Sequence, residues 1–168
     1  PKNNFLKKIR KFADEKKLIL IFDECTTGFR ETFGGIHKIY GVNPDILILG
    51  KALGNGYAIN AVLGKKKIMK NINKTFISST FWTERVGPTA AIATLKEMKR
   101  LKSWYYVSNY GRYIKKKWED IFDKYKLDVE IIGLDSMPLF NFKNKKNNQE
   151  FKSFITLEML KRGFLATN

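Results

Sequence analysis

Asp23 and Lys51 offer a carboxylate and an amine that could act together in one active site. Asp23 follows the apolar run 18–22, and Lys51 follows the run 46–49 and Gly50. Short runs rich in Ile and Leu are typical of strands buried on both faces of a parallel sheet, and ligands bind beyond the carboxyl ends of such strands. We therefore expect an acid and an amine close together at one edge of an α/β sheet.

An acid and a lysine in this arrangement meet two needs of pyridoxal phosphate. The ring of this cofactor needs a carboxylate that keeps its pyridine nitrogen protonated, and a lysine that forms a Schiff base and later moves a proton. The segment between Asp23 and Lys51 is long enough for a loop, a short helix and a return strand. A pyridoxal-phosphate site is therefore the first candidate.

Nucleotide hydrolysis is the second candidate, because many ATPases also present a magnesium-binding acid at the end of an apolar strand. That chemistry requires a phosphate loop of the form G-x-x-x-x-G-K followed by Ser or Thr. Around Gly50 and Lys51, position 45 is Asp where glycine is needed and position 52 is Ala where a hydroxyl is needed. The sequence contains no phosphate loop, and an ATPase fragment is a distant alternative.

The composition is that of a folded protein, since the 168 residues are 43% hydrophobic and 14% aromatic. No apolar run approaches the roughly 18 residues of a membrane span, and residues 1–8 lack the apolar core of a signal peptide. One cysteine excludes an internal disulfide and, with one histidine, a zinc site of the usual type. We expect a cytoplasmic protein with no membrane partner and no metal.

The net charge of +16 raises the possibility of a basic nucleic-acid-binding module. The lysines are scattered along almost every expected helix. Lysine also far outnumbers arginine, although arginine is the residue that recognition of phosphates and DNA grooves favours. A solvated basic surface is the better interpretation, and no nucleic-acid partner is expected.

Helical patterns alternate with short apolar runs along the chain. Helices are expected over 3–17, 66–73, 88–101, 103–125 and 147–162. Strands or extended pieces are expected over 18–22, 46–49, 59–63, 75–79, 129–132, 138–142 and 164–166. The order of elements changes after residue 102, where an α/β part gives way to a smaller α+β part.

Three stretches of the chain resemble the class III pyridoxal-phosphate-dependent aminotransferases. They are DECTTGFR at 23–30, YGVNPD at 40–45 and LGKALGNG at 49–56. The resemblance extends over nearly the whole chain and is closest in character to the glutamate-1-semialdehyde aminomutase branch. It implies an α/β protein of fold type I. Residues 1–102 would belong to the cofactor-binding large domain, and residues 103–168 would begin the C-terminal small α+β domain.

The resemblance also implies roles for individual residues. Asp23 would pair with the pyridine nitrogen, and Lys51 would be the catalytic residue that carries the cofactor as a Schiff base. Cys25 falls where the family has a small residue against one face of the ring. Thr80 matches a threonine that binds the cofactor phosphate across the interface of a homodimer.

The implied reaction moves an amino group between a small-molecule donor and an aldehyde or keto acceptor. The near alternative is the intramolecular exchange of an aminomutase. Residues 81–88, FWTERVGP, depart from the Ser-Gly-Asn-Pro type of sequence that follows the threonine in that branch. Family members are much longer and carry upstream a turn that holds the phosphate and an aromatic residue for the other ring face. We therefore expect a fragment that lacks a competent cofactor site on its own.

Polar residues near the pair have simpler expected roles. Glu24 is expected to make structural hydrogen bonds, and His37 to pack or lie at the surface. Arg30 is expected to orient the loop after Asp23. Cys25 is not expected to act as a nucleophile, because no histidine lies near it in the sequence.

Overall fold

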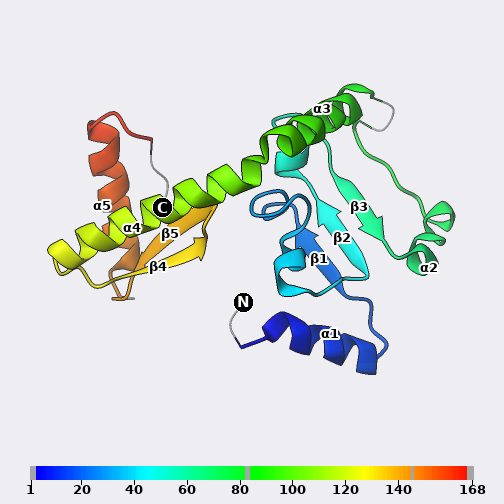
Figure 1. The fold of residues 1–168 in the computed structure, drawn as a ribbon, viewed down its shortest axis with the longest axis horizontal. Coiled ribbons are helices and arrows are strands. Elements are labelled where there is room, and N and C mark those ends of the chain that lie inside the picture. The colour runs from blue at the N-terminus through cyan, green and yellow to red at the C-terminus, as the bar shows by residue number, and fades with distance from the viewer. Residues whose placement is uncertain (1–2, 82–83, 145, 166–168) are drawn as a thin grey trace. The chain divides into compact units, whose positions relative to one another are not determined.

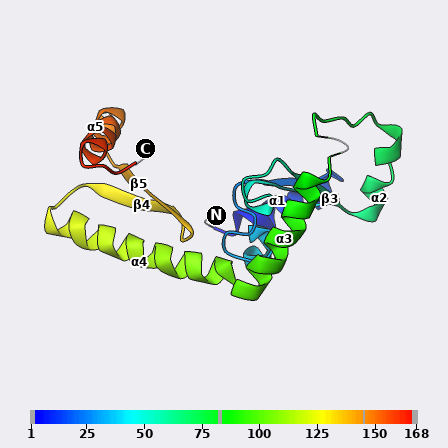
Figure 2. The same ribbon diagram turned by 90° about the horizontal axis from the view of Figure 1, so that it is seen from above.

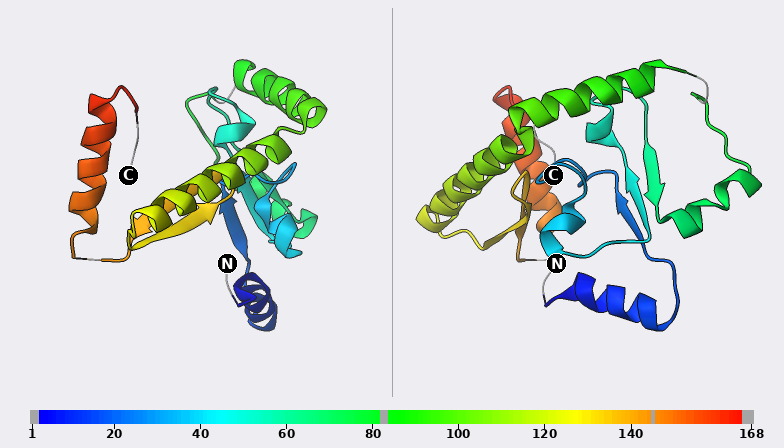
Figure 3. Two further views of the ribbon diagram at one scale, coloured as in Figure 1. Left: turned by 60° about the vertical axis from the view of Figure 1, so that its left-hand side comes forward. Right: turned by 45° about the vertical axis from the view of Figure 1, so that its right-hand side comes forward.

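The structure is a computed structural model that describes residues 3–81, 84–144 and 146–165. The chain divides into two compact units, Pro1–Val107 and Ser108–Asn168. Helix α4 (Ser103–Lys124) begins in the first unit and ends in the second as one continuous helix, seen in both views of Figure 3. Within the described ranges, no helix is long and apolar enough to cross a membrane.

Three strands form the sheet of the first unit, and they lie side by side in Figure 1. Strand β1 (Ile21–Glu24) runs parallel to β2 (Ile46–Leu49), and β3 (Ala61–Gly64) runs antiparallel to β2 on its other side. The register pairs Glu24 with Leu49, so the carboxyl ends of β1 and β2 coincide. The prediction that the two apolar runs form parallel strands is confirmed, and the structure shows in addition that the two strands are neighbours.

Strand β1 begins three residues later than the expected strand 18–22. The Leu18 N–H donates to the Ala13 carbonyl at 2.8 Å and closes helix α1 (Phe5–Glu15). The Leu20 N–H donates to the Asp45 carboxylate at 2.8 Å. These bonds hold residues 18–20 outside the ladder, so Asp23 lies within the strand instead of following it.

The expectation that both strands are buried on both faces is wrong for this chain. Ile21 is 51% exposed, and Leu49 is the one residue of β2 that is fully buried. The physical reason is that β1 and β3 are both edge strands, and the described helices cover only part of the sheet. Apolar runs predict strands, but they do not specify what covers them.

The core of the first unit lies at the carboxyl end of β2. Phe29 from the loop after β1, Leu49, Leu53 and Ala91 form its buried cluster. Leu53 belongs to the short 3-10 helix η2 (Lys51–Leu53), and Ala91 belongs to α3 (Val86–Leu101). The core therefore supports the edge of the sheet from which Asp23 and Lys51 project.

The remaining elements of the first unit are short. They are η1 (Ile36–Tyr40), α2 (Lys66–Met69) and η3 (Ile72–Lys74). The single helix expected over 66–73 is therefore divided in two, and the extended piece expected at 75–79 forms no strand. Lys102 ends α3 in the left-handed conformation at φ 51°, beside the expected domain boundary. That boundary stays a prediction, since the compact units divide a few residues later.

The second unit contains a hairpin and two helices. Figure 2 shows α4 beside the hairpin. Strands β4 (Val129–Leu134) and β5 (Met137–Phe142) pair antiparallel and are followed by α5 (Asn148–Lys161). Both strands and the helix were predicted. Gly163 follows α5 with φ 82°, as expected of a C-cap glycine. Residues 164 and 165 form no strand, and residue 166 lies outside the described residues.

Aromatic rings join the hairpin to the helices of the second unit. Phe140 of β5 packs edge-on against Trp118 and Phe122 of α4, with ring centroids 5.2 and 5.5 Å apart. Phe142 contacts Phe151 of α5 at 4.9 Å. A Cβ atom on Gly111 of α4 would lie 1.6 Å from the Asp135 carbonyl, so only glycine allows the hairpin turn to approach α4 this closely.

Candidate active site

The loop after β1 and the turn after β2 leave the sheet at the same edge and bring Asp23, Cys25 and Lys51 together. Asp23 lies opposite Ile48 in the register, and Lys51 begins η2 two residues after β2 ends. The three groups interact electrostatically, because the charge of Lys51 favours the ionised form of Asp23 and opposes the rise in the pKa of Cys25 that Asp23 causes. The Lys51 Nζ donates a hydrogen bond of 2.7 Å to the Thr26 Oγ1.

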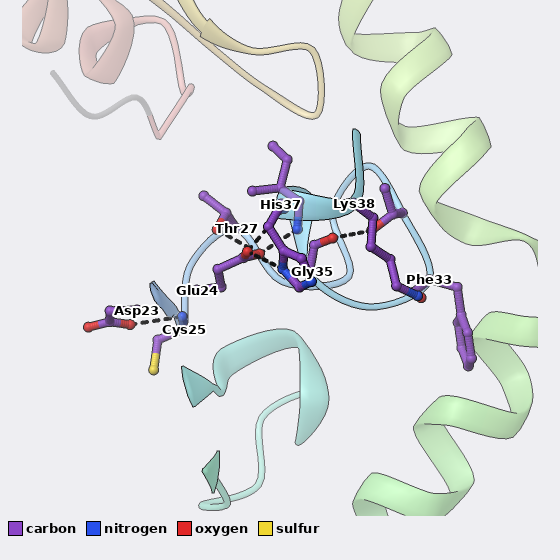
Figure 4. A network of polar contacts seen from close by, with 10 residues as sticks. Asp23, Glu24, Cys25, Thr27, Phe33, Gly35, His37 and Lys38 are labelled. Carbon is purple, nitrogen blue, oxygen red and sulfur yellow. Dashed lines mark hydrogen bonds and ion pairs between the residues drawn. The ribbon is translucent and has the colours of Figure 1, made fainter. Parts of the chain in front are cut away.

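Asp23 is an exposed carboxylate held in one orientation by its own loop. Its Oδ1 accepts the backbone N–H of Cys25 at 3.0 Å, as Figure 4 shows. This hydrogen bond, followed by the Cys25 side chain and the charge of Lys51, holds the pKa of Asp23 below its ordinary value of 3.8. Asp23 is therefore ionised at neutral pH and can hold a positive charge beside it.

Cys25 is a partly buried thiol between Asp23 and the turn after β2. The Asp23 carboxylate and partial burial raise the pKa of the Cys25 thiol above its ordinary value of 9.0. Because the thiolate is the nucleophilic form, a raised pKa makes Cys25 inert at neutral pH. Cys25 thus behaves as a small apolar side chain in this site.

The backbone of Lys51 is strained. Its φ of 40° lies in the left-handed region, which a lysine adopts only where the surrounding structure imposes it. The turn does so, because the Leu53 N–H donates to the Gly50 carbonyl at 2.9 Å and the Gly54 and Asn55 N–H groups both donate to the Lys51 carbonyl at 3.1 Å. Strain of this kind is concentrated at functional sites.

Gly50 is the point at which three segments meet. A Cβ atom at this position would lie 2.2 Å from the Asn60 Oδ1 and 3.3 Å from the Cys25 Sγ. Only glycine lets the loop after β1 and the segment before β3 approach the Lys51 turn this closely. The glycine before the lysine is thus required for packing.

Lys51 lines two cavities of the first unit. The larger has a volume of about 790 Å³ and is also lined by Asn60, Thr80 and Glu84. The smaller, of about 380 Å³, is also lined by Arg30 and Trp104. The structure therefore places Thr80 on the same cavity as Lys51, and the loop carrying Arg30 on the other.

A buried carboxylate, that of Glu24, organises the loop between β1 and η1. Its oxygens accept the N–H of Ile36, the N–H of His37 at 3.0 Å and the His37 ring Nδ1 at 2.7 Å, and the Thr27 hydroxyl lies 3.5 Å away. Figure 4 shows Glu24 facing His37 and Gly35 in the middle of this loop. The Glu24 oxygen accepts this bond in the tautomer of His37 that carries its proton on Nδ1.

The sequence interpretation of Glu24 and His37 agrees with this network, but Thr26 was missed as a possible site residue. Its signal in the sequence is a hydroxyl three residues after the acid at a strand end, in a loop that returns to the sheet. Threonine is common in such loops for structural reasons. The contact with Lys51 therefore became visible only in the fold.

An acid and a lysine near the coinciding ends of two parallel strands lie where α/β proteins commonly bind ligands. A family model, Aminotransferase class-III, matches residues 1–167. The chain is 38% identical to a 3-aminobutyryl-CoA aminotransferase of Cloacimonas acidaminovorans over 144 residues, which are 85% of this chain and 35% of that protein. It is 44% identical to a glutamate-1-semialdehyde 2,1-aminomutase of Nitrosopumilus maritimus over 109 residues, which are 63% of this chain and 26% of that protein.

Among solved structures, the FumI protein of Sphingopyxis sp. MTA144 matches with a TM-score of 0.89 and 26% identity, over 96% of this chain and 39% of that chain. The chain belongs to the class III aminotransferase family. It has the α/β architecture of fold type I, as expected from the resemblance. It spans 35% and 26% of the lengths of the two curated relatives named above. The family match does not support the ATPase or the nucleic-acid-binding alternative.

Proposed function

We propose that this chain forms part of an enzyme that uses pyridoxal phosphate to transfer an amino group from a small-molecule donor to an aldehyde or keto acceptor. The observation that carries the proposal is the meeting of Asp23, Cys25 and Lys51 at the carboxyl ends of β1 and β2 in a class III chain. The proposal concerns the activity of the whole protein, because the chain spans 35% of the first relative's length.

The residues of this edge fit the cofactor. Asp23 has a lowered pKa and suits a protonated pyridine nitrogen, while Lys51 offers a primary amine on the wall of two cavities. Cys25 offers a protonated thiol, small enough to lie against a flat ring. Thr80 carries a hydroxyl of the type that binds a phosphate oxygen, and the family resemblance assigns it to the phosphate in the site of a second copy of the chain. When bound, the cofactor supplies an electron sink for the charge that develops at the substrate carbon.

Asp23 and Lys51 would have different roles in the reaction. The fixed negative charge of Asp23 holds a proton at the ring nitrogen, an electrostatic role that is strongest where water is excluded. The Lys51 amine would hold the cofactor, and its Nζ would move a proton from the substrate carbon to another position. The strained turn holds the backbone of Lys51 at the wall of the two cavities.

The proposal is tested by the half-reaction with an amino donor. Donor added to the purified protein loaded with pyridoxal phosphate should lower the visible absorption of the cofactor and release one keto or aldehyde product per site. Lys51→Ala should abolish the release, whereas Lys66→Ala, an exposed lysine in α2, should leave it unchanged. Release that persists in Lys51→Ala would overturn the assignment.

An aminomutase is the second candidate, and the 44% identity to an aminomutase favours it. An aminomutase moves the amino group within one substrate, so it needs no separate acceptor. The two reactions are distinguished by the nitrogen balance. If the protein is an aminotransferase, isotope-labelled nitrogen from the donor should appear in an added acceptor. If it is an aminomutase, the label should be found in the rearranged product and not in the added acceptor.

The assembly and cellular location follow from the same proposal. A threonine that reaches a phosphate across an interface requires a second copy of the chain, so we propose a homodimer that shares each site. We also propose a cytoplasmic location, which suits the free thiol of Cys25. Analytical ultracentrifugation and cell fractionation would test these two statements.

A further inference from the structure

Thr26 presents its hydroxyl to the reacting amine of the proposed site. The Lys51 Nζ donates to the Thr26 Oγ1 at 2.7 Å, although the two residues are 25 positions apart in the chain. Asp23 affects Lys51 by charge, but its Oδ1 already accepts the Cys25 N–H. The Thr26 hydroxyl is therefore the group that fixes the direction of the amine.

The loop that carries Thr26 is held at several points. The Gly28 N–H donates to the Glu24 carbonyl at 2.8 Å, and the Arg30 Nε donates to the Thr26 carbonyl at 3.3 Å. A Cβ atom on Gly28 would lie 2.7 Å from a methyl carbon of Leu49, so the loop packs directly against β2. Thr26 thus offers a fixed acceptor to a mobile side chain.

The amine needs such an acceptor, because a lysine side chain has four rotatable bonds and a compact head group that can point in many directions. The strained turn fixes only the backbone of Lys51. A reacting group must be held in a productive geometry for efficient reaction, and one fixed hydrogen bond at the end of a flexible chain supplies that restraint.

We propose that Thr26 is a positioning residue for the Lys51 amine, a role that rests on the proposed function in so far as Lys51 is the reacting lysine. The hydroxyl accepts one N–H of Nζ and so holds the end of the lysine side chain in one direction. If pyridoxal phosphate were bound here, Nζ would form the C–N bond with its aldehyde carbon, and the aldehyde oxygen would leave as water with two protons from the amine. Thr26 itself is not altered.

The first test measures the motion of the lysine without any cofactor. NMR relaxation of the Lys51 side chain, assigned by its loss in Lys51→Arg, should show restricted motion in the parent protein. In Thr26→Val, which keeps the shape but removes the hydroxyl, the motion should increase to that of an exposed lysine such as Lys66. Thr26→Ser should restore the restriction. Equal mobility in the parent and Thr26→Val would overturn the proposal.

The second test measures capture of Lys51 by pyridoxal phosphate, with borohydride reduction and mass spectrometry of the modified peptide. Thr26→Val should lower the capture rate by about tenfold, because it removes one hydrogen bond of about 1.4 kcal/mol. Thr26→Ser keeps the hydroxyl, so its capture rate should remain within about twofold of the parent rate. Thr32→Val is the matched control, because its hydroxyl bonds to the Gly35 carbonyl of the same loop at 2.9 Å and not to Lys51.

An equal loss of capture in Thr32→Val, or a Thr26→Ser variant as slow as Thr26→Val, would show that loop structure and not the hydroxyl matters, and would overturn the proposal. If the parent protein shows no preference of pyridoxal phosphate for Lys51, the proposed function fails. The relaxation measurement still decides the role of Thr26 in that case.

Discussion

Replacing Glu24 with Gln should loosen the loop that carries Thr26. The carboxylate is 3% exposed and accepts from two backbone N–H groups and the ring of His37. A glutamine keeps one acceptor oxygen but turns an NH2 group toward these donors. A buried donor that loses its acceptor costs about 1–3 kcal/mol. We expect a loss of about 3 kcal/mol in the stability of this loop.

The expected loss is measured by amide hydrogen exchange at Ile36 and His37. About 3 kcal/mol corresponds to exchange that is roughly a hundredfold faster at these two amides. The chain has one histidine, so its ring gives a single set of NMR signals. In the parent protein these should report a proton on Nδ1, and in Glu24→Gln that preference should weaken.

The control is Glu15→Gln, which removes a carboxylate that is 57% exposed and lies 3.8 Å from Lys11. An exposed ion pair of this kind contributes little, so exchange at Ile36 and His37 should not change. If Glu24→Gln leaves exchange at both amides within about threefold of the parent, Glu24 does not organise the loop.

Three further predictions follow from the first unit. The Leu20 N–H, Lys65 and Arg10 lower the pKa of Asp45 in the folded protein. The contribution of the Asp45 carboxylate to stability is therefore fully present above about pH 3.8 and is lost as the pH falls through the lower folded pKa. Acid unfolding should show this pH dependence, and Asp45→Asn should abolish it. Gly50→Ala should destabilise the unit by about 1–3 kcal/mol through overpacking, and Asn60→Ala in the same chain should recover part of the loss, both measured by chemical denaturation. Asp23→Ala should still allow capture of pyridoxal phosphate at Lys51 but lower amino transfer by about a hundredfold or more, measured as product released per unit time; unchanged transfer would remove Asp23 from the mechanism.

The sequence predicted the elements whose signals are local. The run Ile46–Leu49 became β2 without a shift, and the glycine after α5 ended that helix as expected. The start of β1 was wrong because the side chain of Asp45, remote in the sequence, occupies the Leu20 N–H. Hydrophobic periodicity depends only on the residues of the segment itself, so it cannot predict a hydrogen bond to a side chain that is remote in the sequence.

The candidate site could be predicted only in part for the same reason. Asp23, Cys25 and Lys51 were identified because their motif has characteristic residues at characteristic spacing. Glu24 and His37 were both noticed, but their hydrogen bond joins residues 13 positions apart and depends on the path of a loop. The Thr26 contact with Lys51 depends on the packing of two separate turns, which no local pattern specifies.

The central claim is that Lys51 is the lysine that binds pyridoxal phosphate. The direct measurement is borohydride reduction of the purified protein after incubation with one equivalent of the cofactor, followed by peptide mapping of every lysine. The cofactor should be found on Lys51, and Lys51→Arg should lose it without transfer to another lysine. Cofactor spread over the many exposed lysines, or captured equally well by Lys51→Arg, would contradict the account.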